Sequence, residues 1–536
     1  MPEHQKPDLI LCNGKLHTQD PDDPEATAVA MAQGRFVAVG EDDEVLALAS
    51  PGTRRVDLAG QRVLPGLTDS HFHLYSWALS RQRLSLVEAS SLADLRRRLA
   101  ARISETPRGG WVLGQGWNET RWPASNVPSR ADLDEVAPDH PVLLWRSDLH
   151  MAVANSRALH EAGVNGDTPD PPQGRIDRDS AGRPTGILRE QAVDLVRERL
   201  PEPAENEVVE AMRDGFGVLH CLGLTGVHDH RIMGGADGPP AFHAYQRLLG
   251  EGELPLRLWM GIPGERLDEA VALGLRSGFG DAYLRVGHVK IFGDGSQGAR
   301  TAWMVEPYDD AEGCGMPLTP MDEIATAVEK ADRAGLAVAV HAIGDRTNRE
   351  LITAFEQHAR HDGRGIPHRI EHAQIMRPRD VERLARLDVA ASMQPIHVTD
   401  DIVLSEKSIG ERSRFAYPFR DMLDAGVTLA FGSDAPVSDP NPMWGLHAAV
   451  TRRDRQGSPE GGWYPAQRLT VAEAVWGFTM GPAIVSGLAG VLGSISPGKL
   501  ADLVVLDRDI FAIEPMGIYG AEVVMTVFDG GIVYER

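Results

Sequence analysis

Several short apolar segments of this chain end at residues whose side chains bind metal ions. These side chains are four imidazoles, one amine and one carboxylate: His71, His73, His341, His372, Lys290 and Asp434. The carboxyl ends of parallel strands meet at one edge, and in a (β/α)8 barrel that edge is the active-site face. If the segments close into one barrel, the six side chains meet there. Their chemistry predicts a divalent-metal centre that lowers the pKa of water toward neutrality.

Two His-x-His pairs differ in their context. His71 and His73 follow LPGLTDS, and in an extended segment residues i and i+2 share a face, so both rings can bind one ion. His228 and His230, in VHDH, end another expected strand. This second pair either faces the same cleft or forms hydrogen bonds near it without metal.

Asp434 and Lys290 are charged residues at the ends of apolar segments. An unpaired buried carboxylate is costly, so Asp434 in FGSDAP calls for a cation nearby. Desolvation lowers the pKa of a lysine and frees the neutral amine. Residue chemistry leaves two states open for Lys290. One is a carbamate, formed with carbon dioxide, that bridges two ions; the other is an unmodified amine paired with Asp294 or Asp434.

Eight apolar segments alternate with amphipathic helical patterns. We expect them to be strands at residues 63–69, 223–229, 254–260, 285–291, 336–341, 367–371, 388–394 and 427–433. Alternation of strand and helix predicts parallel β-structure, and eight repeats predict a closed barrel. The expected fold class is α/β, with a (β/α)8 TIM barrel formed by residues 63–75 and 201–487.

The rest of the chain predicts two further parts. Residues 1–62 and 488–536 alternate apolar and polar residues around glycine turns, which predicts a β-sandwich built from both termini, or else two unrelated hairpins. Residues 76–200 are too many for one strand-to-helix connection, so we expect an inserted α/β domain over the barrel mouth. Its tryptophans either wall a substrate pocket or form the core of the insert: Trp111, Trp117, Trp122 and Trp145.

A glycine-rich segment follows Lys290. Residues 293–298, GDGSQG, match a dinucleotide-binding pattern, but such a site needs a helix that starts on the third glycine. Pro307 and Gly313 would break a long helix there. We expect instead a loop whose amides and Arg300 face the substrate.

Composition disfavours several classes of partner. The chain of 536 residues has 54 Lys and Arg against 77 Asp and Glu, and a net charge of −23 disfavours nucleic acid and anionic membranes. No apolar window approaches the ~20 residues that span a bilayer, and we expect no secretory signal. The three cysteines form no C-x-x-C pair, which favours a reducing, cytoplasmic setting. The expected partners are a small-molecule substrate and a second copy in a homodimer.

Motifs along the whole chain resemble those of one family. They are LPGLTDSHFH, GWNETRW, RSDLHMAVANSRAL, GRPTGILRE, VKIFGDGSQGARTA, VHAIGD, RIEHAQ, MQPIH, GSDAPV and PGKLADLVVLD. In this order they resemble the amidohydrolase superfamily, in the amidohydrolase-3 or YtcJ-like branch that includes N-substituted formamide deformylases. The resemblance implies the same barrel, a flanking sandwich from both termini and an inserted domain.

The resemblance also implies roles for individual residues. His71, His73 and Asp434 match the ligands of one divalent ion, and His341 and His372 match those of a second. Both ions are expected to be zinc, with manganese or iron as alternatives, and Lys290 matches the carboxylated bridge. His150 matches a histidine that reaches the site from the insert, although Leu149 replaces the glycine expected before it. The residues expected near the substrate are Trp117, His228, Arg300, Gln394 and His397.

The implied reaction is hydrolysis of a non-peptide carbon–nitrogen bond in a small molecule, either an amide, an N-formyl or N-acyl group, or a carbamate. Asp434 would take a proton from water and return it to the amine, and one metal together with a cleft donor, either His150 or an arginine, would hold the oxyanion. The alternatives are a lyase or isomerase, a deaminase and a non-catalytic scaffold. Deaminase relatives carry H-x-x-E, whereas His341 is followed by Gly344 at that spacing. All six ligand positions carry the residue that the family has there, which disfavours a non-catalytic scaffold.

Overall fold

A parallel eight-stranded sheet forms the centre of the molecule. The computed structural model describes residues 6–124, 126–359 and 366–536. The strand order is β21-β20-β19-β18-β17-β16-β15-β8, so each barrel strand pairs with the next barrel strand along the chain. A parallel bridge between Phe72 of β8 and Ala435, which follows β21, joins the two outer strands. The sheet is therefore a nearly closed barrel, and the predicted fold class is confirmed.

The barrel strands alternate with helices along the chain. The strands are β8 (Leu67–Phe72), β15 (Leu224–Asp229), β16 (Arg257–Pro263), β17 (Leu284–Phe292), β18 (Val338–Ala342), β19 (His368–His372), β20 (Val389–Met393) and β21 (Leu429–Phe431). The main helices are α7 (Glu205–Cys221), α8 (Gly238–Gly250), α10 (Met321–Ala334), α11 (Asp345–His358), α12 (Pro378–Leu384), α13 (Pro395–Ile409), α15 (Pro442–Thr451) and α16 (Val471–Phe478).

The first barrel strand differs from the prediction. Residues 63–69 were expected to form one strand, but β7 (Arg62–Pro65) pairs in another sheet and β8 starts at Leu67. Gly66 separates them, and a Cβ there would lie 2.3 Å from Thr225 Oγ1. The chain passes between the two sheets at a point where only glycine fits. The apolar run VLPGL therefore belongs to two elements.

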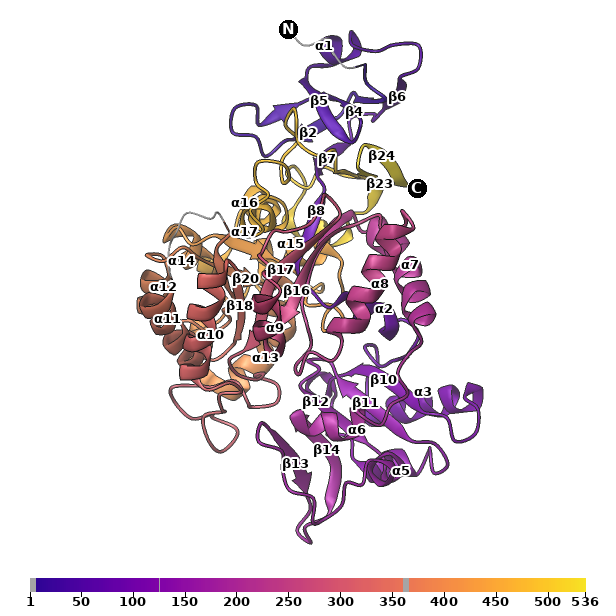
Figure 1. Ribbon diagram of the computed structural model, residues 1–536, viewed down its shortest axis with the longest axis vertical. Coiled ribbons are helices and arrows are strands. Elements are labelled where there is room, and N and C mark those ends of the chain that lie inside the picture. Colours follow the sequence, from indigo (N-terminus) through magenta and orange to yellow (C-terminus); the bar gives the residue numbers. More distant parts are fainter. Residues whose placement is uncertain (1–5, 125, 360–365) are drawn as a thin grey trace.

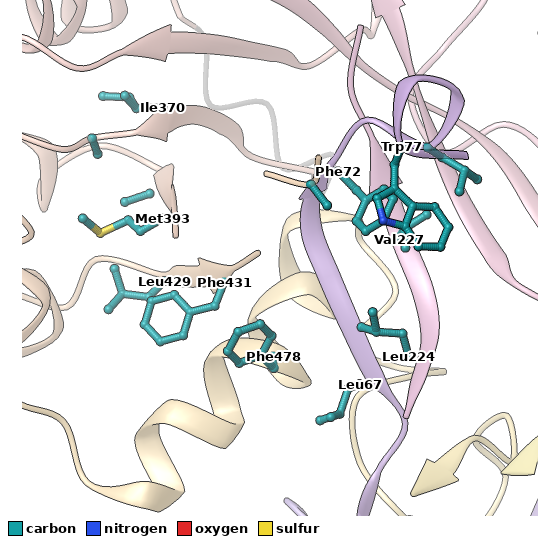
Figure 2. Close-up of a cluster of buried hydrophobic side chains, with 14 of the residues drawn as sticks. Leu67, Phe72, Trp77, Leu224, Val227, Ile370, Met393, Leu429, Phe431 and Phe478 are labelled. Atoms are coloured by element: carbon teal, nitrogen blue, oxygen red, sulfur yellow. The ribbon is translucent and has the colours of Figure 1, made fainter. Parts of the chain in front are cut away.

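Apolar side chains of the first and last barrel strands pack closely against one another and against the surrounding helices. Figure 2 shows Leu67 and Phe72 of β8 near Leu224 and Val227 of β15, with Phe431 of β21 beside Phe478 of α16. The rings of Phe431 and Phe478 have centroids 5.7 Å apart. These side chains are buried, which explains why parallel strands read as nearly continuous apolar runs.

Strands from the two termini share a sheet at the amino end of the barrel. One sheet has the order β24-β23-β22-β7-β2-β3, and β7 pairs antiparallel with β22 (Leu503–Leu506). The remaining members are β2 (Lys15–His17), β3 (Glu25–Ala26), β23 (Val523–Phe528) and β24 (Gly531–Glu535). The second sheet has the order β5 (Arg35–Gly40), β4 (Ala28–Ala32), β1 (Leu9–Cys12) and β6 (Arg54–Asp57). The termini therefore do not form separate hairpins, and the boundaries at residues 62 and 488 stay predictions.

Residues between β8 and β15 contain a sheet of their own at the opposite end of the molecule (Figure 1). Its order is β13 (Gly174–Arg178), β14 (Pro184–Glu190), β12 (Met151–Ala154), β11 (Val142–Arg146), β10 (Val112–Trp117) and β9 (Leu84–Ser85). Helix α3 (Leu92–Glu105) packs against it. Ser296, just after β17, donates to Asp148 at 2.9 Å, so this sheet adjoins the carboxyl edge of the barrel. Among the described residues, no helix is both long and apolar enough to cross a membrane.

The tryptophans of this region are largely core residues. Trp117 is 0% exposed, and its Nε1 donates to the carbonyl oxygen of Leu144 at 2.9 Å. Trp122 is buried and donates to the carbonyl oxygen of Ala89. The expectation that Trp117 contacts substrate is therefore corrected, because its ring has no free surface and its only polar atom is bonded.

Candidate metal centre

The imidazoles predicted as ligands meet at the carboxyl edge of the barrel. His71 lies near the end of β8, and His73 directly follows that strand. His341 lies in β18, and His372 ends β19. The ring centroid of His372 lies 4.9 Å from that of His71 and 4.5 Å from that of His341. All four residues are buried. The structure thus brings together four rings that the sequence places on separate segments.

Hydrogen bonds determine the tautomers of His71 and His73. Nδ1 of His71 lies 2.5 Å from Glu371 Oε2, and Nδ1 of His73 lies 3.1 Å from the carbonyl oxygen of His230. Because both partners are acceptors, Nδ1 carries the proton in each ring. The two Nε2 atoms lie 3.4 and 3.1 Å from Asp434 Oδ1. Burial, together with the nearby Lys290 amine, lowers the pKa of His71 well below its usual value, so this ring is neutral.

The resulting arrangement needs a cation. A neutral His71 presents the Nε2 lone pair to a carboxylate oxygen, and this buried nitrogen has no hydrogen-bond partner among the described residues. Lone pairs that face one another repel, and a buried unpaired polar atom costs free energy. The donor set of two imidazole nitrogens and a carboxylate oxygen is the one that zinc-like ions prefer. The residues present therefore fit a divalent metal ion.

Two of these residues occupy a backbone region that side chains rarely adopt. Asp434 has φ +62° and His372 has φ +69°. Such strain persists where the surrounding structure enforces it, commonly at functional sites. Asp69 enforces it here, because its carboxylate accepts bonds from the backbone amide and hydroxyl of Ser433, beside Asp434. Sequence reasoning missed Asp69, although it lies in the LTDSHFH motif.

Arg369 and Glu371 form a buried ion pair beneath the centre. Arg369 Nε donates to Glu371 Oε1 at 2.6 Å. Burial alone would raise the pKa of Glu371, but the Arg369 guanidinium outweighs this and holds it well below its usual range. Glu371 is therefore ionised, and its second oxygen orients His71. Neither residue was predicted, although both lie in the motif RIEHAQ.

The His228-Asp229-His230 segment takes part in this ion-pair network. Arg369 donates to Nδ1 of His228 at 2.8 Å and to Nε2 of His230 at 3.1 Å. His228 also borders a cavity at the amino end of the barrel, together with Arg257 and Asp502. The expected substrate contact of His228 is corrected, because the residue faces away from the metal centre.

Lys290 is buried without a counter-ion. Burial lowers the pKa of its amine to about 8. Among the described residues, no carboxylate oxygen lies within 4.0 Å of its Nζ, which lies 4.8 Å from the Phe292 ring centroid. The more distant carboxylates of Glu371 and Asp434 favour the charged amine, but burial outweighs them. Asp294 accepts bonds from the amides of Ile343 and Gly344. Lys290 therefore forms no direct ion pair with Asp294, and Asp434 acts on it only from a longer distance.

The remaining predicted residues have different environments. Arg300 forms two bonds to Asp310, at 2.7 and 2.6 Å, so it is not directed at the centre. Gln394 is buried and donates weakly to the carbonyl oxygen of Ser392. His397 lies next to the metal ligands: one ring nitrogen each of His372 and His397 and one oxygen of Asp434 lie within 4.8 Å of one another.

His150 reaches the cluster from the inserted region. Its ring centroid lies 5.4 Å from that of His341, and its Nδ1 lies 2.7 Å from Glu190 Oε2. Burial alone would lower the pKa of His150, but the Glu190 carboxylate raises it to about 9. Leu149 has φ +60°, which explains why a glycine is expected before this histidine. Glu190, in GRPTGILRE, was not predicted.

Comparisons with known proteins agree with this geometry. The model of the amidohydrolase family matches residues 54–534. The putative amidohydrolase YtcJ of Bacillus subtilis (strain 168) is 32% identical over 98% of this chain and 99% of its own length. The N-substituted formamide deformylase of Arthrobacter pascens is 29% identical over 99% of both chains.

A solved structure matches in three dimensions. An uncharacterized metal-dependent hydrolase from Pyrococcus horikoshii OT3 superposes with a TM-score of 0.76 and 29% identity, over 95% of this chain and 99% of that one. The resemblance seen in the sequence is thus confirmed along nearly the whole chain. The chain belongs to the amidohydrolase family and is a hydrolase that acts on carbon–nitrogen bonds.

Proposed function

We propose that this protein is a metal-dependent hydrolase that cleaves an amide, N-formyl, N-acyl or carbamate bond of a small molecule. The observation that carries the proposal is the pair of Nε2 atoms of His71 and His73, 3.4 and 3.1 Å from Asp434 Oδ1. A neutral His71 whose buried Nε2 lone pair faces a carboxylate oxygen is stabilised by a cation between them. The formamide deformylase and metal-dependent hydrolase among its relatives support this reading.

The cluster would hold two ions. His71, His73 and Asp434 would hold the first ion, and His341 and His372 would contribute to the second. Nitrogen and oxygen donors suit zinc, and manganese or iron are alternatives. Lys290 would act as a carbamate bridge, which its burial and its lack of a carboxylate partner support.

The reaction uses the centre and the residues around it. A bound divalent ion would supply Lewis acidity, which lowers the pKa of a water molecule and polarises a carbonyl group. Asp434 would accept the proton of that water and later return it to the departing amine. The bonds from Ser433 to Asp69 keep the Asp434 turn rigid, so its carboxylate needs little reorganisation.

His150 would stabilise negative charge on the substrate oxygen. The Glu190 carboxylate keeps its imidazole protonated and oriented, and the ring lies beside His341. A cationic donor that is held in place before the reaction lowers the energy of the developing oxyanion. Thr301 donates to the other oxygen of Glu190 and so restrains the pair.

The structure gives a reason to disfavour deamination. In deaminase relatives a glutamate stands three residues after the histidine that corresponds to His341, where this chain has Gly344. A Cβ on Gly344 would lie 2.1 Å from the carbonyl oxygen of Trp303. No side chain fits at this position without movement of the backbone, so the proton-transferring glutamate has no counterpart here.

A substrate screen tests the proposal. The protein, loaded with Zn²⁺ or Mn²⁺, is offered N-formyl, N-acyl and carbamate compounds, and released amine and acid are quantified. We expect stoichiometric release of both products, loss of activity on chelation and recovery on addition of metal. A lyase or isomerase would yield no such pair of products. Equal activity in the chelated protein would contradict the metal requirement.

A further inference from the structure

His397 is buried next to the proposed metal centre, and the reaction above assigns it no role. It is the third residue of α13, its side chain is 8% exposed, and its ring is nearly parallel to that of His372 at a centroid distance of 6.3 Å. Nε2 of His397 and Nδ1 of His372 are buried and lack hydrogen-bond partners among the residues that the structure describes. Buried polar atoms without partners are rare and call for an explanation.

The two rings share a carboxylate with the first ion position. One nitrogen of each ring and one oxygen of Asp434 lie within 4.8 Å of one another. Asp434 Oδ1 also faces the Nε2 atoms of His71 and His73. A single carboxylate is thus adjacent to two pairs of imidazoles.

We infer that His372, His397 and Asp434 form the second ion position, and that the Asp434 carboxylate is shared between the two ions. This inference rests on the proposed metal-dependent function. It makes His397 a metal ligand rather than a substrate contact. It also provides a bridge between the ions that does not depend on modification of Lys290.

The distances are compatible with coordination. Ligand atoms of a tetrahedral ion with bonds of about 2.1 Å are about 3.4 Å apart, so these donors need to approach one another by roughly 1 Å. His341 can contribute to this position only through Nδ1, because its Nε2 lies 3.3 Å from the carbonyl oxygen of Gly295 and is hydrogen-bonded to it. His341 does not appear with His397 in any cluster of donors among the described residues.

The surroundings of His397 favour a bound cation. Asp401 lies one helical turn further along α13, and its carboxylate accepts bonds from Tyr417 at 2.5 Å and Gln374 at 3.1 Å. This bonded carboxylate adds negative charge on the same helix face as His397. Negative charge near His397 stabilises a cation bound there.

A cysteine substitution gives a direct test. Thiolate bound to Co²⁺ absorbs in the near ultraviolet, and imidazole ligands do not produce this charge-transfer band. We expect the band in Co²⁺-loaded His397→Cys and no band in wild type. The control variant is His243→Cys, at an exposed position of α8, and it should show no band either. No band in a folded, Co²⁺-loaded His397→Cys protein would overturn the inference.

Metal stoichiometry provides a second test. We expect two ions per chain in wild type and in His243→Gln, and one in His397→Gln after dialysis against metal-free buffer, with folding checked by circular dichroism. Two retained ions with only a raised KM would show that His397 contacts substrate, and would also overturn the inference. Wild-type protein that binds two ions and gives the expected spectra, but hydrolyses no carbon–nitrogen bond in the screen, would refute the proposed function and leave the inference standing.

Discussion

Nδ1 of His71 lies 2.5 Å from Oε2 of Glu371, although the two residues are 300 positions apart in the chain. This contact places the proton on Nδ1 and leaves the Nε2 lone pair directed at Asp434. The ion pair with Arg369 in turn keeps Glu371 charged. Glu371 and Arg369 thus set the tautomer of His71 and leave its Nε2 available toward Asp434.

Glu371→Gln should weaken metal binding. The amide removes the negative charge that orients His71 and leaves Arg369 without its counter-ion. Loss of such a partner typically lowers metal affinity by about 10–100-fold. The measurement is a Zn²⁺ competition titration, with Glu382→Gln, an exposed position of α12, as control. Unchanged affinity in Glu371→Gln would show that the tautomer of His71 does not depend on this contact.

Asp434→Asn should lower kcat while at least one metal ion stays bound. The amide keeps an oxygen donor but cannot accept a proton, so kcat should fall by about 10²–10⁴-fold, the range for loss of general base catalysis. At least one ion should remain bound through His71 and His73. Initial rates and elemental analysis on the same sample check both statements. A kcat equal to that of wild type would remove Asp434 from the proton transfer.

Lys290→Met should abolish a carbamate signal. Protein equilibrated with ¹³C-bicarbonate should show a ¹³C carbamate resonance in wild type and in Lys330→Met, a lysine on the surface of α10, and none in Lys290→Met. The reason is that only a buried amine with a lowered pKa reacts readily and is then held by cations. If wild type shows no resonance yet binds two ions, the carbamate bridge is wrong.

Glu190→Gln should lower kcat without removing metal. The change weakens the contact that keeps His150 protonated and oriented, and loss of one stabilising donor costs about 10²-fold in kcat. Metal content should stay at the wild-type value, because Glu190 contacts His150 and Thr301 but no proposed ligand. Glu198→Gln, a glutamate of the same region, serves as control. Loss of metal in Glu190→Gln would instead show that His150 helps to hold the metal ligands in place.

Glu473 should contribute to stability in a pH-dependent way. Hydrogen bonds from Arg420 lower the pKa of Glu473 from 4.5 to about 2, and it also caps α16 through Thr470. A lowered folded-state pKa gives stability that is present above about pH 4.5 and is lost as the pH falls toward about 2. The destabilisation caused by Glu473→Gln should therefore be largest near neutral pH and shrink below pH 4.5. Urea unfolding at several pH values, with Glu323→Gln as control, measures this.

The sequence by itself determined the type of fold and the candidate ligands. Apolar runs that end in His, Lys or Asp indicate buried strands whose last residues face one edge, so His71, His73, His341, His372 and Asp434 could be named from local pattern. Their burial and proximity in the structure agree with this pattern. Local periodicity is enough for such inferences, because strand direction and side-chain alternation are set by neighbouring residues.

Only the tertiary structure decided which partners control these residues. Glu371 meets His71, Asp69 meets Ser433, and Glu190 meets His150, each across a distance in the chain that no local pattern spans. The same holds for His397, whose helix position gives no sign that its ring stacks on His372. Closure of the barrel creates these contacts, because it brings the ends of eight separate strands, and the segments that follow them, around one small volume.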